Sequence, residues 1–162
     1  MATVMILWLL GGQIVSAHHV RSSESKINAL INAGLTRSST FRQLVETLDR
    51  SDVIVYVDPK LQRPALGAYL VHNIVSAGGV RYLHIAIDVH GAEGRLVPLL
   101  AHELQHALEV ADEPTVRDSE SMDRLFERLA VEFGCGGTTC AETQAAKDIE
   151  ATVDAELTVA RR

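Results

Sequence analysis

The sequence predicts a single α+β domain in which a small three-stranded sheet packs against one long helix, with two helices before the strands and two after them. Three observations predict this class. Short β-branched segments lie in the middle of the chain, amphipathic segments with helical spacing flank them, and no repeat or linker divides the chain. The chain has 162 residues, 47% of them hydrophobic and 22% charged, which is typical of one globular domain.

Residues 1–17 are expected to be a signal peptide. An apolar run over residues 4–10 is followed by a Gly pair and then by the segment VSA, which is typical of a cleavage site. The run is shorter than the ~20 residues that cross a bilayer, so no stable membrane insertion is expected after cleavage. The predicted domain therefore covers residues 18–162, and we expect the mature protein to be secreted or periplasmic.

Two helices are predicted before the strands. The first covers residues 24–34 and is expected to end at Gly34. Its apolar positions follow helical spacing: Ile27, Leu30 and Ile31. The second helix is expected to begin at Thr40, because Thr40 and Gln43 form a capping-box pattern.

Three strands are predicted to follow. Residues 53–57 form a continuous β-branched and aromatic run, which is typical of a buried strand. Residues 66–75 and 80–88 are expected to pair as an antiparallel hairpin across the four-residue loop SAGG. This pairing places His72 and His84 on opposite faces of the sheet, so we expect them to bind no common metal ion.

The remaining segments predict three helices. The long helix lies within residues 95–114, with Pro98 expected in its first turn, and two further helices cover about 116–133 and 140–160. The apolar stripe of the long helix follows helical spacing: Leu100, Leu104, Ala107 and Ala111.

Composition and cysteine usage exclude several classes of function. The net charge is −6 and no cluster of Lys and Arg is interleaved with aromatic residues, so no nucleic-acid partner is expected. Cys135 and Cys140, in CGGTTC, are expected to form a short-loop disulfide bond in an exported protein. Because these cysteines are assigned to a disulfide and no nucleophile-elbow motif is present, serine and cysteine hydrolases find no support.

The segment AHELQHALE carries the pattern of a metal site. His102 and His106 lie one helical turn apart and about 40° around the axis, so both rings lie over the same patch of surface. Glu103 adjoins the first histidine, where its carboxylate can reach a metal-activated water without binding the metal. This H-E-x-x-H spacing predicts Zn²⁺ as the cofactor.

These residues resemble the active helix of the zincin metallopeptidases, and the order of strands before the helix is similar to the minimal zincin core. The resemblance implies a zinc-dependent hydrolase that cleaves peptide bonds, with Glu103 as the general base. It also implies an edge strand that binds a peptide or protein substrate by β-addition.

The third ligand decides which zincin group the chain resembles. The gluzincin-like pattern brings Glu142 from the last helix, with the small Ala146 four positions later, and Glu142 is the ligand we predict. An alternative role for Glu142 is a capping box with Thr139. The nearby disulfide would fix the start of this helix, which suits a ligand that needs exact placement.

Four other acidic residues stay open as third ligands. Asp112 stands at the metzincin ligand position, although Glu109 replaces the glycine of that pattern. For Glu109 itself, a role in orienting His106 is favoured over ligation. The predicted helix at residues 118–132 offers two further candidates: Glu120 and Glu127.

Two rivals to the peptidase are a zincin-fold protein that binds zinc for an interaction without catalysis, and a metal-free structural domain. The oxyanion-stabilising residue stays open among four residues: Tyr56, Tyr69, Tyr82 and Arg117. The sequence does not choose between proteins, short peptides and cell-wall crosslinks as substrates, and it leaves the oligomeric state open.

Overall fold

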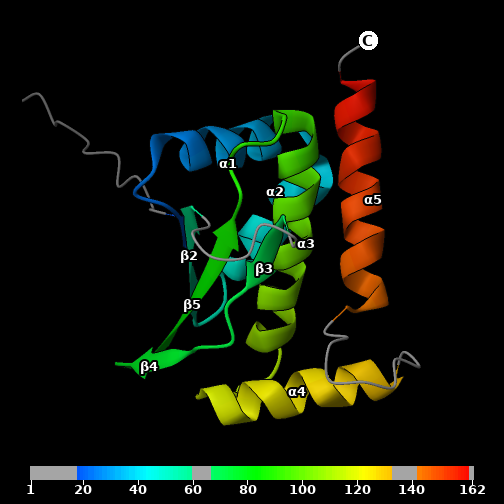
Figure 1. The fold of residues 1–162 in the computed structure, drawn as a ribbon. Helices are drawn as coiled ribbons and strands as arrows, with labels where there is room; N and C mark the ends of the chain where they lie inside the picture. The colour runs from blue at the N-terminus through cyan, green and yellow to red at the C-terminus, as the bar shows by residue number, and fades with distance from the viewer. Residues whose placement is uncertain (1–17, 60–66, 133–141, 161–162) are drawn as a thin grey trace, which may run out of the picture.

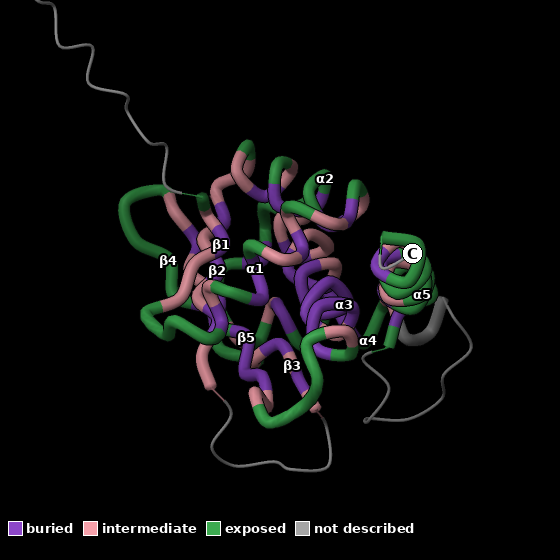
Figure 2. Tube along the Cα trace, turned by 90° about the horizontal axis from the view of Figure 1, so that it is seen from above, coloured by how far each residue is buried: buried purple, intermediate pink, exposed green. Residues whose placement is uncertain are grey.

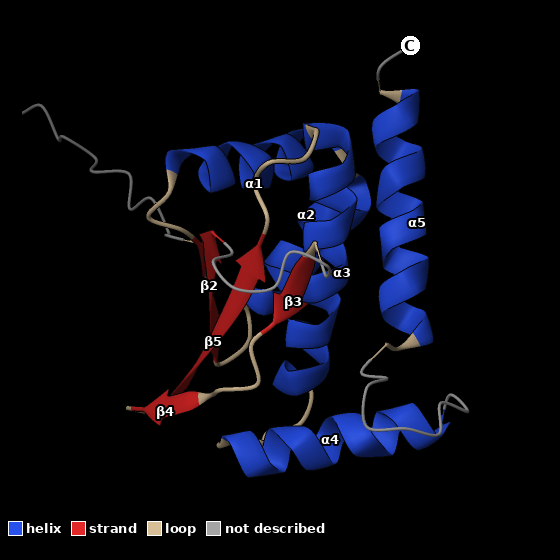
Figure 3. Cartoon of the chain, viewed as in Figure 1, coloured by secondary structure: helices blue, strands red, loops and turns tan. Residues whose placement is uncertain are grey.

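The computed structural model describes residues 18–59, 67–132 and 142–160, which form a mixed α+β fold (Figure 1). Figure 3 shows the helices and strands along this part of the chain. Their bounds, in chain order, are β1 Val20–Arg21, α1 Ser25–Arg37, α2 Ser39–Leu48, β2 Val53–Pro59, β3 Ala68–Leu70, β4 Val75–Ala77, β5 Val80–Ile87, α3 Glu93–Ala111, α4 Ser119–Glu132 and α5 Gln144–Val159.

The sheet has five strands in the described residues, not the three that were predicted. Its order is β1-β2-β5-β3, and β4 pairs with β5 beyond this path. The α+β class is confirmed, but two strands were missed. Val20–Arg21 adds a strand that pairs parallel to β2 after the crossover through α1 and α2. The first strand of the predicted hairpin divides into β3 and β4, which each pair antiparallel to β5.

The turn between β4 and β5 is shorter than the predicted four-residue loop. Ser76 and Ala77 belong to β4 and pair with β5, so only Gly78 and Gly79 remain in the turn. Their φ angles are +59° and +83°, a conformation that two-residue hairpin turns require and that glycine adopts without strain. His72 consequently lies between β3 and β4 rather than on a strand.

The two leading helices form as predicted, but with different boundaries. Helix α1 continues through Gly34 instead of ending there. A Cβ atom at this position would lie 2.6 Å from the Phe41 ring, so Gly34 permits close packing of the two helices. Helix α2 begins after Ser38, whose hydroxyl accepts a hydrogen bond from the Phe41 amide at 2.9 Å. The expected cap at Thr40 is therefore wrong.

Helices cover one face of the sheet. The predicted strand at residues 53–57 is confirmed within β2, but its burial alternates, so only one face is buried. The buried positions of β2 are Val53, Val55 and Val57. Figure 2 shows α3 between the sheet and α5, with its purple, buried residues in the centre of the molecule. This position brings α3 into contact with strands on one side and α5 on the other.

A fully buried arginine fixes the end of α3. Arg81 lies on the inward face of β5 and donates hydrogen bonds to both carboxylate oxygens of Asp52. Its guanidinium also donates to the carbonyl groups of Val110 at 2.7 Å and Ala111 at 2.9 Å, which end α3. The hydrogen bond from Arg81 lowers the pKa of Asp52 below its ordinary value. Arg81 therefore joins the sheet to the helix that carries the H-E-x-x-H segment.

The later helices begin at other residues than predicted. Helix α3 begins at Glu93, so Pro98 lies in its second turn and the hydrogen bond to the Gly94 carbonyl is absent. Helix α5 begins after Thr143, whose hydroxyl accepts from the Ala146 amide at 3.1 Å. Among the described helices, none is both long and apolar enough to cross a membrane.

Three sequence predictions concern residues that the structure does not describe. The predicted signal peptide at residues 1–17 lies outside the described residues, and so do Cys135 and Cys140. Thr139 also lies outside them. Since Thr143 caps α5, Glu142 precedes the helix rather than belonging to its first turn.

Candidate metal centre

The three side chains of the H-E-x-x-H segment are buried together on α3. The relative exposures of His102, Glu103 and His106 are 4%, 6% and 5%. The two imidazole rings meet edge to face with their centroids 5.0 Å apart, on one side of the helix as the spacing predicts. Burying three ionisable groups is costly unless each has a polar partner. Their partners therefore indicate what the cluster can do.

Each imidazole binds a carboxylate through its Nδ1 atom. Glu150 Oε2 of α5 lies 2.9 Å from His102 Nδ1, and Glu109 Oε2 lies 2.8 Å from His106 Nδ1. Glu109 in turn accepts a hydrogen bond from the Thr143 hydroxyl at 2.6 Å. Metal-binding histidines typically hold a carboxylate on one ring nitrogen, which orients the other nitrogen toward the metal. Here both orienting carboxylates bind Nδ1, and His102 Nε2 faces Glu142. Glu109 has the orienting position that was favoured for it.

Glu142, the predicted third ligand, contacts one of the two histidines. Its Oε2 atom lies 3.3 Å from His102 Nε2. Two ligands of a tetrahedral Zn²⁺, each ~2.0–2.2 Å from the metal, are themselves ~3.3 Å apart. In the described part of the chain, however, no three His, Cys, Asp or Glu side chains are grouped closely enough to hold a metal ion. The structure thus brings together two predicted ligands and places the third beside the first of them.

The charges around His102 favour a cation. Burial alone would lower the pKa of His102, but the hydrogen bond with Glu142 and the charges of Glu103 and Glu150 raise it above its ordinary value. The same hydrogen bond lowers the pKa of Glu142. A cluster whose field stabilises positive charge suits a divalent cation as well as a proton. The donor set of two imidazoles and a carboxylate is also one that zinc uses.

Glu103 is held by the edge strand of the sheet. Its Oε2 atom accepts a hydrogen bond from the Leu70 amide of β3 at 2.7 Å. Burial raises the pKa of Glu103 above its ordinary value, although the nearby His106 and His102 act in the opposite direction. A carboxylate with a raised pKa is better matched to accepting a proton near neutral pH. The strand therefore positions the one residue for which a general-base role is predicted.

The start of β3 packs closely on α3. Gly67 precedes the strand with φ +50°, and a Cβ atom there would lie 2.8 Å from Leu99 Cδ2. Together with the Leu70 contact, this aligns β3 along the helix over the turn that ends in His102 and Glu103. β3 ends the path β1-β2-β5-β3, so an edge strand borders the cluster.

The other candidate ligands lie elsewhere. Asp112 is the exposed C-cap residue of α3. Glu120 pairs with Arg124 on α4, and Glu127 is exposed. In the described residues none of these three carboxylates contacts His102 or His106, so Glu142 is the one predicted third ligand placed at an Nε2 atom.

The four candidates for oxyanion stabilisation do not reach the two histidines in the described residues. Tyr56 stacks against Tyr82 with centroids 6.5 Å apart, on the sheet face opposite the buried positions of β2. Arg117 lies 3.6 Å from Asp52 near the end of α3. Tyr69 alternates with the buried Ala68 and Leu70, so its side chain points to the other face of the sheet.

Sequence reasoning missed the residues that surround the pair. Glu150 lies on the inward stripe of α5, whose spacing could have revealed it: Ala146, Glu150, Val153 and Leu157. Phe126 of α4 packs edge to face on His106, with centroids 5.6 Å apart. His72 stacks on the other side of Phe126 and binds Asp123, while His84 binds Asp58. The expectation that His72 and His84 do not converge agrees with these separate partners.

Comparisons with known proteins gave no match. No family model matches the chain, and neither the curated proteins nor the solved structures contain a match. The function therefore has to be inferred from the residues and contacts of this chain.

Proposed function

We propose that the protein is a zinc-dependent metallopeptidase in which His102, His106 and Glu142 bind the metal and Glu103 is the general base. One observation carries the proposal: carboxylates hold both buried imidazoles through Nδ1, which directs the Nε2 atoms away from these carboxylates, and Glu142 lies at the Nε2 atom of His102. The hydrogen bonds that orient them come from α3 itself and from α5. Such support is typical of a metal site rather than of a solvated helix face.

When bound, zinc would supply a Lewis acid that polarises a peptide carbonyl and lowers the pKa of water. Glu103 would accept a proton on its carboxylate and return it to the amine of the cleaved peptide. The Leu70 amide holds Glu103 in place for this exchange. The outer edge of β3 would bind an extended peptide by backbone hydrogen bonds beside Glu103.

The two rivals make different use of the same cluster. His102 already contacts Glu142 through Nε2 and Glu150 through Nδ1. This observation favours a metal-free structural cluster, because the buried imidazole has polar partners without a metal. A zinc-binding interaction protein would keep the metal and lack turnover. As residues 1–17 resemble a signal peptide, we place the protein outside the cytoplasm in each case.

The test compares the purified full chain with Glu103→Gln. We expect both proteins to bind zinc, and we expect the variant to cleave a mixture of fluorogenic peptides about 10²–10⁴-fold more slowly. Glu46→Gln, an exposed carboxylate on α2, is the matched control and should leave cleavage unchanged. Zinc binding without any cleavage by the wild type would favour the interaction protein. Failure to bind zinc would favour the structural domain.

The third ligand needs a separate test. Replacing Glu142 with Gln should weaken zinc binding, whereas Asp112→Asn and Glu120→Gln should not, because these two carboxylates lie away from the histidines. A competition titration with a zinc-binding dye measures all three. Unchanged affinity in Glu142→Gln would remove this residue from the ligand set.

A further inference from the structure

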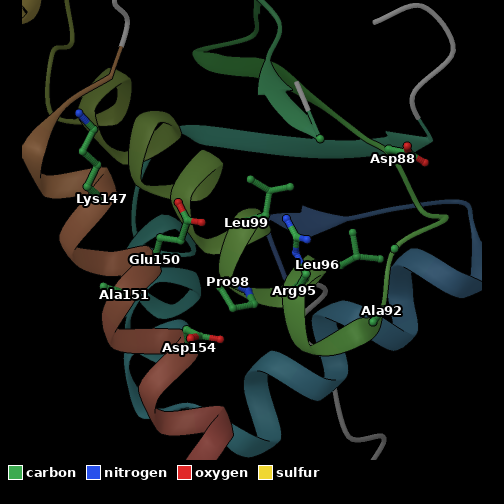
Figure 4. Close-up of a pocket in the computed structure, with 12 residues that line it drawn as sticks. Asp88, Ala92, Arg95, Leu96, Pro98, Leu99, Lys147, Glu150, Ala151 and Asp154 are labelled. Atoms are coloured by element: carbon green, nitrogen blue, oxygen red, sulfur yellow. The ribbon is translucent and has the colours of Figure 1, made fainter. Parts of the chain in front are cut away.

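A pocket of about 590 Å³ lies between the N-terminal half of α3 and the middle of α5 (Figure 4). It adjoins the candidate metal centre, since Glu150 both lines the pocket and binds His102 Nδ1. Leu99, one turn before His102, forms part of its apolar wall together with Leu96 and Pro98. A group bound in this pocket would therefore lie next to the site of the proposed reaction.

The charged residues of the pocket differ in whether their side chains have hydrogen-bond partners. Asp88 accepts hydrogen bonds from the backbone amide and the ring of His90, and Glu150 is bound to His102. The Arg95 side chain, by contrast, makes no hydrogen bond or ion pair with the described residues, and the charge of Lys147 acts on Glu142. Two of the acidic groups thus have polar partners, whereas the Arg95 side chain has none in the described residues.

Arg95 is the cation placed to meet a ligand. Figure 4 shows its guanidinium beside Leu99, across the pocket from Glu150, whereas the Lys147 amine points away from it. Asp154 projects from α5 into the same pocket. Unlike the other two acidic lining residues, it binds neither His90 nor His102. A guanidinium binds a carboxylate with two parallel hydrogen bonds, and neighbouring apolar surface strengthens such a pair by excluding water.

We propose that this pocket binds a carboxylate-bearing group of the substrate, with its apolar stem against Leu96, Pro98 and Leu99 and its carboxylate on Arg95. The inference rests on the proposed peptidase function and adds a substrate class to it. Two sources of the carboxylate share this chemistry: an acidic side chain and the C-terminus of a peptide. Since the Arg95 side chain makes no hydrogen bond or ion pair in the described residues, its replacement tests recognition rather than stability.

The experiment measures binding of three N-acetylated pentapeptides to the full-length Glu103→Gln protein by isothermal titration calorimetry. One peptide carries a central Glu and an amidated C-terminus, the second a central Gln and a free C-terminus, and the third a central Gln and an amidated C-terminus. We expect at least one carboxylate peptide to bind about tenfold or more tightly than the neutral one. The peptide that gains affinity identifies the source of the carboxylate.

The same titrations with Arg95→Gln should abolish this preference, while Arg50→Gln, at an exposed position after α2, should retain it. Equal binding of all three peptides, binding of none, or a preference that survives Arg95→Gln would each overturn the inference. Because binding needs no turnover, an Arg95-dependent preference in a protein without peptidase activity would contradict only the proposed function. Peptidase activity without such a preference would contradict only the pocket's role.

Discussion

Helix α3 makes two unlike contacts with the rest of the molecule. Toward the sheet and the leading helices it presents apolar side chains without exposed surface, namely Leu100, Leu104 and Ala107, and one charged exception, Glu103, which binds the Leu70 amide. Toward α5 it presents His102, which meets Glu150, and Glu109, which binds both Thr143 and His106. Apolar burial stabilises a fold in proportion to its area, whereas paired ionisable groups regain little more than the cost of their desolvation. The first contact therefore holds the fold together, and the second positions chemical groups.

The largest effect is expected on the apolar face. Leu104→Ala should lower the free energy of unfolding by about 2–5 kcal/mol, because it leaves a cavity beside the sheet. Urea denaturation measures this loss, and zinc binding by the folded fraction should not change. Val75→Ala, at a position 55% exposed, is the control and should cost much less. A loss below 1 kcal/mol at Leu104 would contradict the role given to this face.

On the polar face the expected effect concerns the metal. Glu109→Ala removes the carboxylate that binds His106 Nδ1, so zinc affinity should fall about 10–100-fold. Competition with a chelating dye gives the affinity. Glu113→Ala, on the surface beyond the end of the helix, should bind zinc like the wild type. Equal affinities in the two variants would mean that Glu109 does not orient the imidazole.

A smaller effect is expected where α5 joins α2. Partial burial would raise the pKa of Glu156, but hydrogen bonds from Ser38, Ser39 and Thr40 lower it from 4.5 to about 2. A lowered pKa stabilises the folded state above pH 4.5, and this contribution disappears as the pH falls toward 2. Since the side chain remains partly open to water, we expect about 1–2 kcal/mol.

Glu156→Gln tests this pH dependence. Its unfolding free energy in urea should lie below that of the wild type at pH 7, and the difference should shrink as the pH falls below 4.5. Glu46→Gln, on the exposed face of α2, should show no such convergence. A constant difference between Glu156→Gln and the wild type across this range would show that the carboxylate charge is not the cause.

The smallest effect on the free energy of unfolding is expected at His102, on the polar face of α3. In zinc-free protein, His102→Leu should change the free energy of unfolding by less than about 1 kcal/mol, because an apolar side chain of similar volume replaces a desolvated ionisable group. Glu142 and Glu150 are about half exposed and can return to water. Denaturation of both proteins in a chelator measures the difference. A loss as large as that in Leu104→Ala would mean that the polar face also holds the fold together.

The sequence was sufficient for features that depend on local periodicity. The spacing of His102 and His106 predicted that both imidazoles share one side of α3, and the β-branched run at residues 53–57 predicted β2. Helix ends were less predictable, because Gly34 serves the packing of Phe41 and Ser38 is the cap that α2 uses. The position of a helix end therefore depends on packing against other elements of the fold.

Partners that are distant in the sequence could not be predicted from local periodicity. Arg81 occupies a buried, inward position of β5 because Asp52 and the carbonyl groups at the end of α3 bind it. Glu150 reaches His102 from 48 positions away along the chain. A pattern of residue types marks these positions as unusual, but only the packing of β5 and α5 on α3 assigns their partners.

The most direct test of the central claim is the zinc content of the purified full chain, measured by elemental analysis after incubation with Zn²⁺ and removal of the excess. The proposed site predicts about one zinc ion per chain, and loss of this zinc in the double variant His102→Leu, His106→Leu. A wild-type protein that retains no zinc, or a double variant that retains as much, would contradict the claim that these two imidazoles bind a metal.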